Sequence, residues 1–201
     1  TIRNKSVAVA KGDYLIFLDG DSVPRTSFVK QHQKLAEHEY FVVGNRILLF
    51  SEFTKKVLLQ DIPVQRWNMW CWLRSFCSGW SNRFLPIFPL GNFYLRYLRR
   101  TKWQGVKTCN LGIWKEDFFA VNGFDESYSG WGYEDSDLAI RLIRNHVLRK
   151  DGHFAVPVFH LWHPEHSRNL EQVNYQKLEE IKNSPRINAE YGVDQYMLKR
   201  V

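Results

Sequence analysis

The sequence GDYLIFLDGDSVPR at residues 12–25 joins a short apolar run to an acidic turn. Residues 14–18 (YLIFL) have the length and composition of a buried β-strand, and they end at Asp19-Gly20-Asp21. A helix-like stretch follows over about residues 28–38, and residues 41–43 (FVV) suit another strand. Strand, helix and strand in this order predict an α/β fold.

Residues 56–107 differ in pattern from the parts of the chain on either side of them. This stretch has weak periodicity and holds five of the eight tryptophans. Within it, FLPIFPL at residues 84–90 is apolar but broken by proline, which argues against a regular helix or a central strand. Beyond residue 110, Leu138, Leu142 and Ile143 have the spacing of an amphipathic helix, which we expect over 134–148. Residues 154–159 suit a strand, and the polar tail from Leu170 suits a helix.

Composition indicates a globular protein with phosphate-bearing partners. The 201 residues are 44% hydrophobic and 24% charged, which excludes disordered, collagen-like and coiled-coil classes. No run approaches about eighteen apolar residues, so we expect no transmembrane helix. The net charge of +7 attracts phosphates of a nucleic acid, a nucleotide or an anionic membrane. Three irregularly spaced cysteines without a CxxC pair suit a reducing compartment.

The Asp19-Gly20-Asp21 turn is a candidate cation site. In an open α/β sheet, ligands bind at the carboxyl ends of strands, where this turn is expected to lie. Two carboxylates separated by a glycine can hold a hard divalent cation, and the glycine allows a ligand to approach closely. The same three residues also suit a solvated acidic turn, so both interpretations stay open here.

Two later segments carry further chemistry. Residues 130–137 (GWGYEDSD) place a tryptophan between two glycines just before the expected helix. Helix capping alone would explain the three acidic residues at the start of the expected helix. A helix start also favours the ionised form of Asp135, which is the state that a general base requires. Residues 160–166 (HLWHPEH) follow a strand and hold three histidines. Histidines ligate transition metals, but taken alone this segment is read by default as a polar loop without metal.

Three segments together resemble a known family: GDYLIFLDGDSVPR, NLGIWKEDFFAVNGFDESYSGWGYEDSDLAIRL and VFHLWHPEHSR. They are similar to family 2 glycosyltransferases of the GT-A fold, and more narrowly to the group with the galactosyltransferase-type C-terminal motif, as in bacterial lipopolysaccharide and capsule transferases. The likeness covers most of residues 5–45 and 105–168. It implies a mixed central sheet flanked by helices, in one partial catalytic domain over residues 1–201 with a Trp/Arg-rich insertion at about 56–107. Such enzymes begin with further strands, so the resemblance also implies an N-terminally truncated chain.

The resemblance implies a donor site at the acidic turn. Asp21 would be a direct ligand of a divalent metal, Mn²⁺ or Mg²⁺, and Asp19 would face the ribose or the sugar of a UDP-sugar. A late histidine would join the metal, with His160 as the first choice and His163 next, while His166 stays open. The metal would neutralise charge on the departing UDP.

The resemblance also implies an acceptor site with a base. Asp135 would deprotonate the acceptor hydroxyl, and Glu134 would position the acceptor sugar. Trp131 would stack on a sugar ring, with Gly132 beside it in the closing loop. Attack on the anomeric carbon opposite UDP inverts its configuration in one displacement, which requires positioning, base catalysis and leaving-group stabilisation.

The function so implied is metal-dependent, inverting hexosyl transfer from a UDP-sugar to a saccharide acceptor. The resemblance places it in lipopolysaccharide or surface-polysaccharide synthesis, in the cytoplasm or on the cytoplasmic face of the inner membrane. Two alternatives belong to other classes: a non-catalytic, sugar-binding remnant of the GT-A fold, and a basic binder of membrane surfaces or nucleic acid.

The tryptophan-rich stretch bears on the last alternative. Its aromatic and basic side chains suit packing onto the core, and they equally suit contact with anionic lipid, where a lipid-linked acceptor would place the enzyme. No nucleic-acid motif accompanies them, so we expect no nucleic-acid partner. The residues concerned are Trp67, Trp70, Trp72, Trp80 and Trp103, interleaved with Arg66, Arg74, Arg83, Arg96, Arg99 and Arg100.

Overall fold

Two mixed β-sheets form the centre of the protein in the computed structural model, which describes residues 1–84, 90–164 and 168–197. The four-stranded sheet has the order β1 (Tyr14–Leu18), β5 (Asn110–Trp114), β3 (Tyr40–Val43) and β6 (Leu148–Asp151). The three-stranded sheet has the order β2 (Ser22–Pro24), β7 (Pro157–His160) and β4 (Asn45–Leu48). The expected α/β architecture with a mixed central sheet, as in the GT-A fold, is confirmed.

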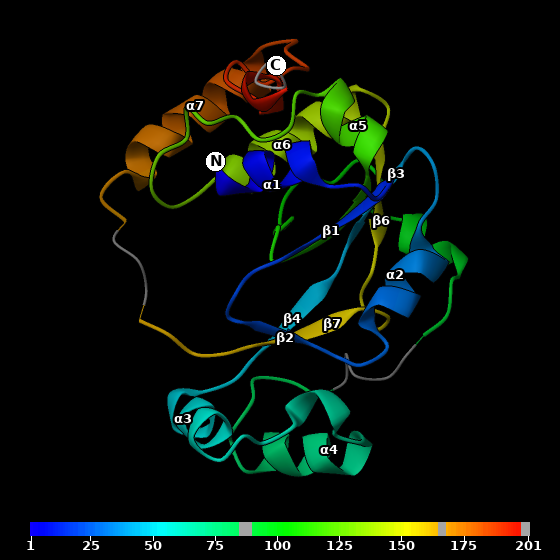
Figure 1. The fold of residues 1–201 in the computed structure, drawn as a ribbon, viewed down its shortest axis with the longest axis vertical. Coiled ribbons are helices and arrows are strands. Elements are labelled where there is room, and N and C mark those ends of the chain that lie inside the picture. Colours follow the sequence, from blue (N-terminus) through cyan, green and yellow to red (C-terminus); the bar gives the residue numbers. More distant parts are fainter. Residues whose placement is uncertain (85–89, 165–167, 198–201) are drawn as a thin grey trace.

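Helices cover the sheets from several sides (Figure 1). Near the N-terminus lie α1 (Ile2–Val9), α5 (Lys115–Ala120), α6 (Glu134–Arg144) and α7 (Glu171–Asn183). A single helix, α2 (Phe28–Leu35), flanks the sheets, while α3 (Ser51–Leu59) and α4 (Met69–Cys77) lie at the opposite end of the molecule. Short 3₁₀ turns cover Val64–Arg66, Tyr94–Tyr97 and Val193–Tyr196. Within the described residues, no helix is long and apolar enough to span a membrane.

A glycine and an asparagine join the two sheets. The chain passes from β3 to β4 through Gly44, where a Cβ atom would lie 2.2 Å from the Asn110 side chain, so no larger residue fits. Asn110 Nδ2 donates to the carbonyl oxygens of Asn45 and Val156, and its Oδ1 lies 3.1 Å from Nε2 of the buried His32. One buried side chain therefore links β5, β4, α2 and the approach to β7.

The predicted elements are present, and the differences lie at their ends. The strand over residues 14–18 has the predicted bounds, and the polar tail forms α7. The helix expected over about 28–38 ends at Leu35, because Ala36 takes an extended backbone. The helix expected over 134–148 ends at Arg144, and His146 at a φ of 63° turns the chain toward β6. The prediction for 84–90 falls mainly on 85–89, outside the described residues.

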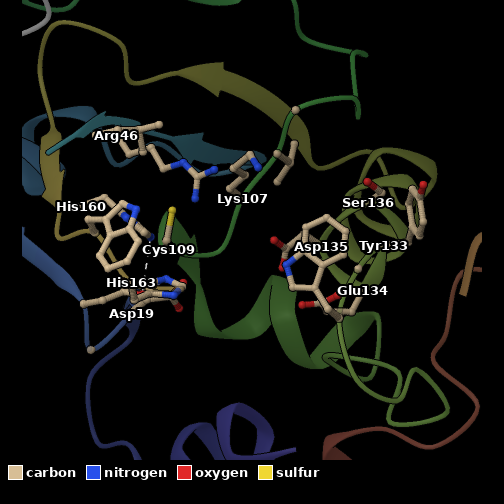
Figure 2. A pocket seen from close by; sticks show the side chains of 18 of the residues that line it. Asp19, Arg46, Lys107, Cys109, Tyr133, Glu134, Asp135, Ser136, His160 and His163 are labelled. Carbon is tan, nitrogen blue, oxygen red and sulfur yellow. Dashed lines mark ion pairs between the residues drawn. The ribbon is translucent and has the colours of Figure 1, made fainter. Parts of the chain in front are cut away.

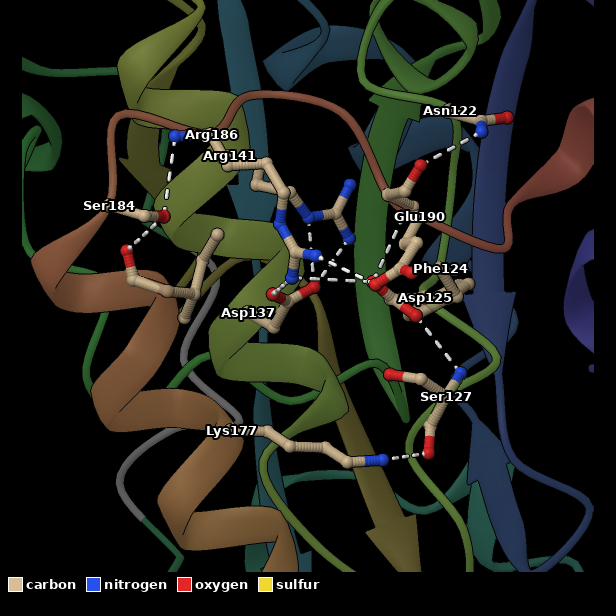
Figure 3. A network of polar contacts seen from close by, with 12 residues as sticks. Asn122, Phe124, Asp125, Ser127, Asp137, Arg141, Lys177, Ser184, Arg186 and Glu190 are labelled. Atoms are coloured by element: carbon tan, nitrogen blue, oxygen red, sulfur yellow. Dashed lines mark hydrogen bonds and ion pairs between the residues drawn. The ribbon is translucent and has the colours of Figure 1, made fainter.

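A buried ion pair within α6 is joined to the C-terminal segment by Arg186 (Figure 3). Arg141 donates from Nη2 and Nε to Asp137 Oδ2 at 2.6 and 2.8 Å, and both side chains are fully buried. Arg186, which follows α7, lies 3.4 Å from Asp125 and 3.9 Å from Asp137. The third acid of the 134–137 run therefore serves packing, and it points away from its two neighbours.

The tryptophan-rich stretch builds a second core beneath β7. Trp72 is fully buried and stacks on Phe159 with ring centroids 3.9 Å apart. Phe53 stacks on Trp80 at 4.8 Å. Trp70, two residues from Trp72 in the same helix, is 68% exposed. Packing onto the core thus explains Trp72 and Trp80 but leaves Trp70 without an internal role.

Arg96 also belongs to the interior, although the sequence groups it with surface arginines. Its guanidinium is buried and donates to four backbone carbonyl oxygens, those of Leu90, Gly91, Asp151 and His153. These bonds satisfy the buried charge and hold the 90–97 segment against the end of β6.

Replacing Trp72 by alanine should lower the free energy of unfolding by about 3–5 kcal/mol, because the change removes a fully buried, stacked ring. Trp70→Ala is the matched control: it lies in the same helix but is exposed, so its loss should stay within about 0.5 kcal/mol. Urea unfolding followed by circular dichroism gives both values. Equal losses in the two variants would contradict the buried aromatic cluster.

Candidate active site

A cavity of about 890 Å³ opens where β1 and β7 end and α6 begins (Figure 2). Its walls come from α1, the turn after β1, the end of β4, the loop before β5, the loop before α6 and the segment after β7. Every candidate residue of the sequence analysis within the described ranges lines this cavity: Asp19, Asp21, Trp131, Gly132, Glu134, Asp135, His160 and His163. His166 lies outside the described residues.

Strand pairing brings the acidic turn to the histidines. In the antiparallel ladder of β2 and β7, Ser22 is opposite His160, and the Leu161 amide donates to the Asp21 carbonyl at 2.8 Å. Asp21 Oδ2 then lies 3.5 Å from His160 Nε2 and 3.0 Å from His163 Nε2. One ligand atom from each of the three side chains lies within 4.8 Å of the other two.

These three side chains fit a divalent metal. Burial lowers the pKa of His160, with Asp21 opposing the shift, so the imidazole is neutral and offers a lone pair. One carboxylate oxygen and two imidazole nitrogens suit a first-row transition ion such as Mn²⁺ better than Mg²⁺, which prefers oxygen alone. Asp19 stands apart from this cluster, because its carboxylate pairs with Arg3.

Arg3 is a site residue that sequence reasoning missed. Its Nη2 lies 3.2 Å from Asp19 Oδ1, while its Nη1 lies 3.5 Å from Glu134 Oε1 and 3.8 Å from Asp135 Oδ1. One guanidinium thus spans three carboxylates from two distant parts of the sequence. No motif or spacing in the sequence indicated that a basic residue of α1 would pair with these acids.

Asp135 is half-buried and held by the backbone and side chain of Thr108. Thr108 Oγ1 donates to Oδ1 at 2.6 Å, and the Thr108 amide donates to Oδ2 at 3.1 Å. Burial and the neighbouring Glu134 raise the pKa of Asp135 to about 6, while Thr108 and Arg3 oppose the rise. The helix start was predicted to favour the ionised form of Asp135, but loss of solvent raises the pKa instead.

Aromatic rings border the cavity near α6. Trp131 is 41% exposed, and the Arg168 guanidinium carbon lies 4.7 Å from its ring centroid. Trp162, also exposed, lines the cavity after β7. Gly132 has a φ of 107° and open space where a Cβ would stand, so the left-handed backbone alone accounts for glycine there. Flat, accessible rings of this kind suit the apolar faces of sugars.

Two cations, Arg46 at β4 and Lys107 before β5, line the wall that faces the acids of α6 (Figure 2). The sequence analysis did not single out either residue. Their positive charge next to the Asp21 cluster suits an anionic group such as a phosphate. One cavity therefore combines three side chains that could hold a cation, two cations that suit an anionic group, and a carboxylate that can accept a proton.

The chain shares short segments with curated glycosyltransferases. It is 40% identical over 58 residues to Validoxylamine A glucosyltransferase of Streptomyces hygroscopicus subsp. jinggangensis (strain 5008), covering 29% of this chain and 14% of the relative. It is 40% identical over 89 residues to Chondroitin sulfate synthase 3 of Homo sapiens, covering 44% and 10%. It is 47% identical over 45 residues to Beta-1,4-galactosyltransferase 4 of Rattus norvegicus, covering 22% and 12%. The chain thus spans 10–14% of the length of these relatives.

Two family models match the chain over regions that overlap at residues 94–104. The family described as N-terminal domain of galactosyltransferase matches residues 94–157, which include Thr108 and the 130–137 segment. The family described as Glycosyl transferase family 2 matches residues 2–104, half of the chain, including Arg3 and the Asp19-Gly20-Asp21 turn. The cavity walls are therefore drawn from both matched regions, and the chain belongs to glycosyl transferase family 2.

Proposed function

We propose that this chain transfers a hexose from a UDP-sugar to a saccharide acceptor, with inversion at the anomeric carbon and with a divalent metal. The observation that carries this proposal is one cavity with Asp21, His160 and His163 on one wall and Asp135 on another. Membership of glycosyl transferase family 2 supports sugar transfer, and the glucosyltransferase and galactosyltransferase names of two relatives support a hexose.

Asp21, His160 and His163 would hold the metal, and the two nitrogen ligands favour Mn²⁺ over Mg²⁺. When bound, the metal neutralises negative charge on the departing diphosphate. The chain contributes the Asp21 carboxylate and two imidazoles, and the β2–β7 ladder holds His160 next to Asp21. Arg46 and Lys107 would add positive charge toward the donor phosphates, and Asp19 would face the ribose or the sugar.

Asp135 would accept the proton of the attacking acceptor hydroxyl. The two hydrogen bonds from Thr108 fix the plane of its carboxylate. A pKa of about 6 leaves the group ionised at neutral pH yet more basic than an ordinary aspartate, which suits a general base. Glu134 and Trp131 would position the acceptor sugar beside it, with Gly132 in the same loop. Nothing in this scheme requires a covalent intermediate.

The non-catalytic alternative explains less of the site. A sugar-binding remnant needs neither three clustered side chains that could hold a cation nor a carboxylate with a pKa raised toward neutrality. Both features occur in one cavity here, which favours the transferase. An acceptor in lipopolysaccharide or surface-polysaccharide synthesis, and a cytoplasmic location, stay predictions.

Asp21→Asn and His163→Gln should each weaken Mn²⁺ binding by at least about tenfold, because each removes one of three converging ligand atoms. Isothermal titration calorimetry with Mn²⁺ alone measures this without any need for turnover. His38→Gln, at an exposed histidine paired with Glu116, is the control and should bind as the unaltered chain does. Unchanged affinity in both ligand variants would refute the metal assignment.

Asp135→Asn should reduce the rate of sugar transfer by about 10²–10⁴-fold, because the amide cannot accept the acceptor proton. UDP binding in the presence of Mn²⁺ should change little, since Asp135 is not among the three clustered ligands. Asp61→Asn, at an exposed position outside the cavity, is the control. A loss of UDP binding that equals the loss of rate would argue against a base.

The transfer rate should rise with pH and level off above about pH 6, because only deprotonated Asp135 accepts a proton. The Thr108 hydroxyl bond stabilises the charged form, so Thr108→Val should raise the pKa of Asp135 and move the midpoint to higher pH. A pH profile of kcat/KM for both proteins tests this. A midpoint that stays fixed or moves down in Thr108→Val would contradict the assignment.

A further inference from the structure

Positive charge is concentrated in one part of the chain. Residues 51–107 contain ten lysines and arginines but only two acidic residues, which gives this stretch a charge of +8. The whole chain has a net charge of +7, so everything outside the stretch sums to −1. Residues 51–84, which contain α3 and α4, hold five of these cations and both acids, so they have a charge of +3. The other five cations lie at residues 96–107, where Arg96 is buried and Lys107 lines the cavity.

The outward side of α4 is apolar. Trp72 and Ser75 are buried, while Met69, Trp70 and Phe76 are exposed. The Phe76 ring also contacts the Phe84 ring, with centroids 5.2 Å apart. No acidic residue occurs in α4, and Arg74 is its only charged residue. Such a helix presents an aromatic and basic face to its surroundings, which is typical of helices that lie in a membrane interface.

The end of α3 adds to this surface. Leu58 and Leu59 are exposed, the latter by 84%, and α3 lies beside α4 at the same end of the molecule (Figure 1). Arg66 and Arg83 flank α4 in the sequence, and within the described residues neither they nor Arg74 lies in an ion pair. We call this the α3–α4 surface: Leu58, Leu59, Met69, Trp70 and Phe76 with Arg66, Arg74 and Arg83.

We propose that the α3–α4 surface docks onto an anionic lipid bilayer. Its charge complements anionic headgroups, and its exposed aromatic and aliphatic side chains can enter the acyl boundary, whereas a purely electrostatic ligand would leave them in water. The inference goes beyond the proposed function and does not depend on it.

The same surface adjoins the cavity. Phe50, which precedes α3, and Trp162 are both exposed and both line the cavity. The Trp162 amide donates to Thr54 Oγ1 of α3 at 2.9 Å. A bilayer at the α3–α4 surface would therefore lie on the side of the molecule where α3 meets the cavity wall.

Sedimentation with vesicles tests the proposal on the full chain. Binding to phosphatidylcholine vesicles should strengthen by at least about tenfold when phosphatidylglycerol is added. The double variant Trp70→Ser/Phe76→Ser and the triple variant Arg66→Gln/Arg74→Gln/Arg83→Gln should each weaken binding to the mixed vesicles by at least about tenfold. The controls Val173→Ser/Tyr191→Ser and Lys11→Gln/Lys30→Gln/Lys34→Gln change exposed residues elsewhere and should bind as the unaltered chain does.

A label on the unaltered surface gives a measurement that does not rely on these variants. With Cys71→Ser, an environment-sensitive fluorophore on the exposed Cys77 of α4 should shift to the blue on mixed vesicles. Urea unfolding and Mn²⁺ titration of every variant separate a loss of docking from a loss of fold or of the metal site.

Three results would overturn the docking proposal. One is that the chain does not sediment with mixed vesicles and the emission of the Cys77 label does not shift. Another is that the double variant binds them as tightly as the unaltered chain, which would indicate attraction to any polyanion. The third is a dimer that Trp70→Ser/Phe76→Ser dissociates while vesicle binding is absent, which would make a second copy the occupant.

Discussion

The antiparallel pairing of β2 with β7 is the constraint on which the site depends. Because Ser22 is opposite His160, two segments far apart in the sequence place Asp21 beside His160 and His163. The parallel partner β4 holds β7 from the other side, and the stack of Trp72 on Phe159 supports the residue just before His160. The tryptophan-rich stretch therefore stabilises the strand from which the candidate metal site extends.

Charge compensation explains how the acids share one cavity. Asp19, Glu134 and Asp135 would repel one another without Arg3, which lies within 3.8 Å of all three. Partial loss of solvent and the neighbouring Glu134 raise the pKa of Asp135, but Thr108 and Arg3 keep the rise moderate. Arg46 and Lys107 face Glu134 and Asp135 across the cavity (Figure 2), so positive and negative side chains line opposite walls. This arrangement favours an anionic donor on one side and a hydroxyl acceptor on the other.

The sequence predicted the features that depend on local pattern. The strand over 14–18, the mixed α/β architecture and the family follow from apolar runs and motifs, and all candidate residues of the described ranges line one cavity, although their roles stay predictions. Arg3 and Thr108 were missed because only tertiary packing decides which side chains reach Asp135. Asp137 belongs to the same acidic run, yet it turns inward because Arg141 follows it by one helical turn.

Titration of UDP into the protein with and without Mn²⁺ tests the central claim most directly, namely that Asp21 and its histidines form a metal site for a nucleotide-sugar donor. Calorimetry should show binding of UDP that weakens by at least about tenfold when Mn²⁺ is omitted or when Asp21 is replaced by asparagine. Binding that is equal with and without Mn²⁺, or no binding under either condition, would contradict the claim.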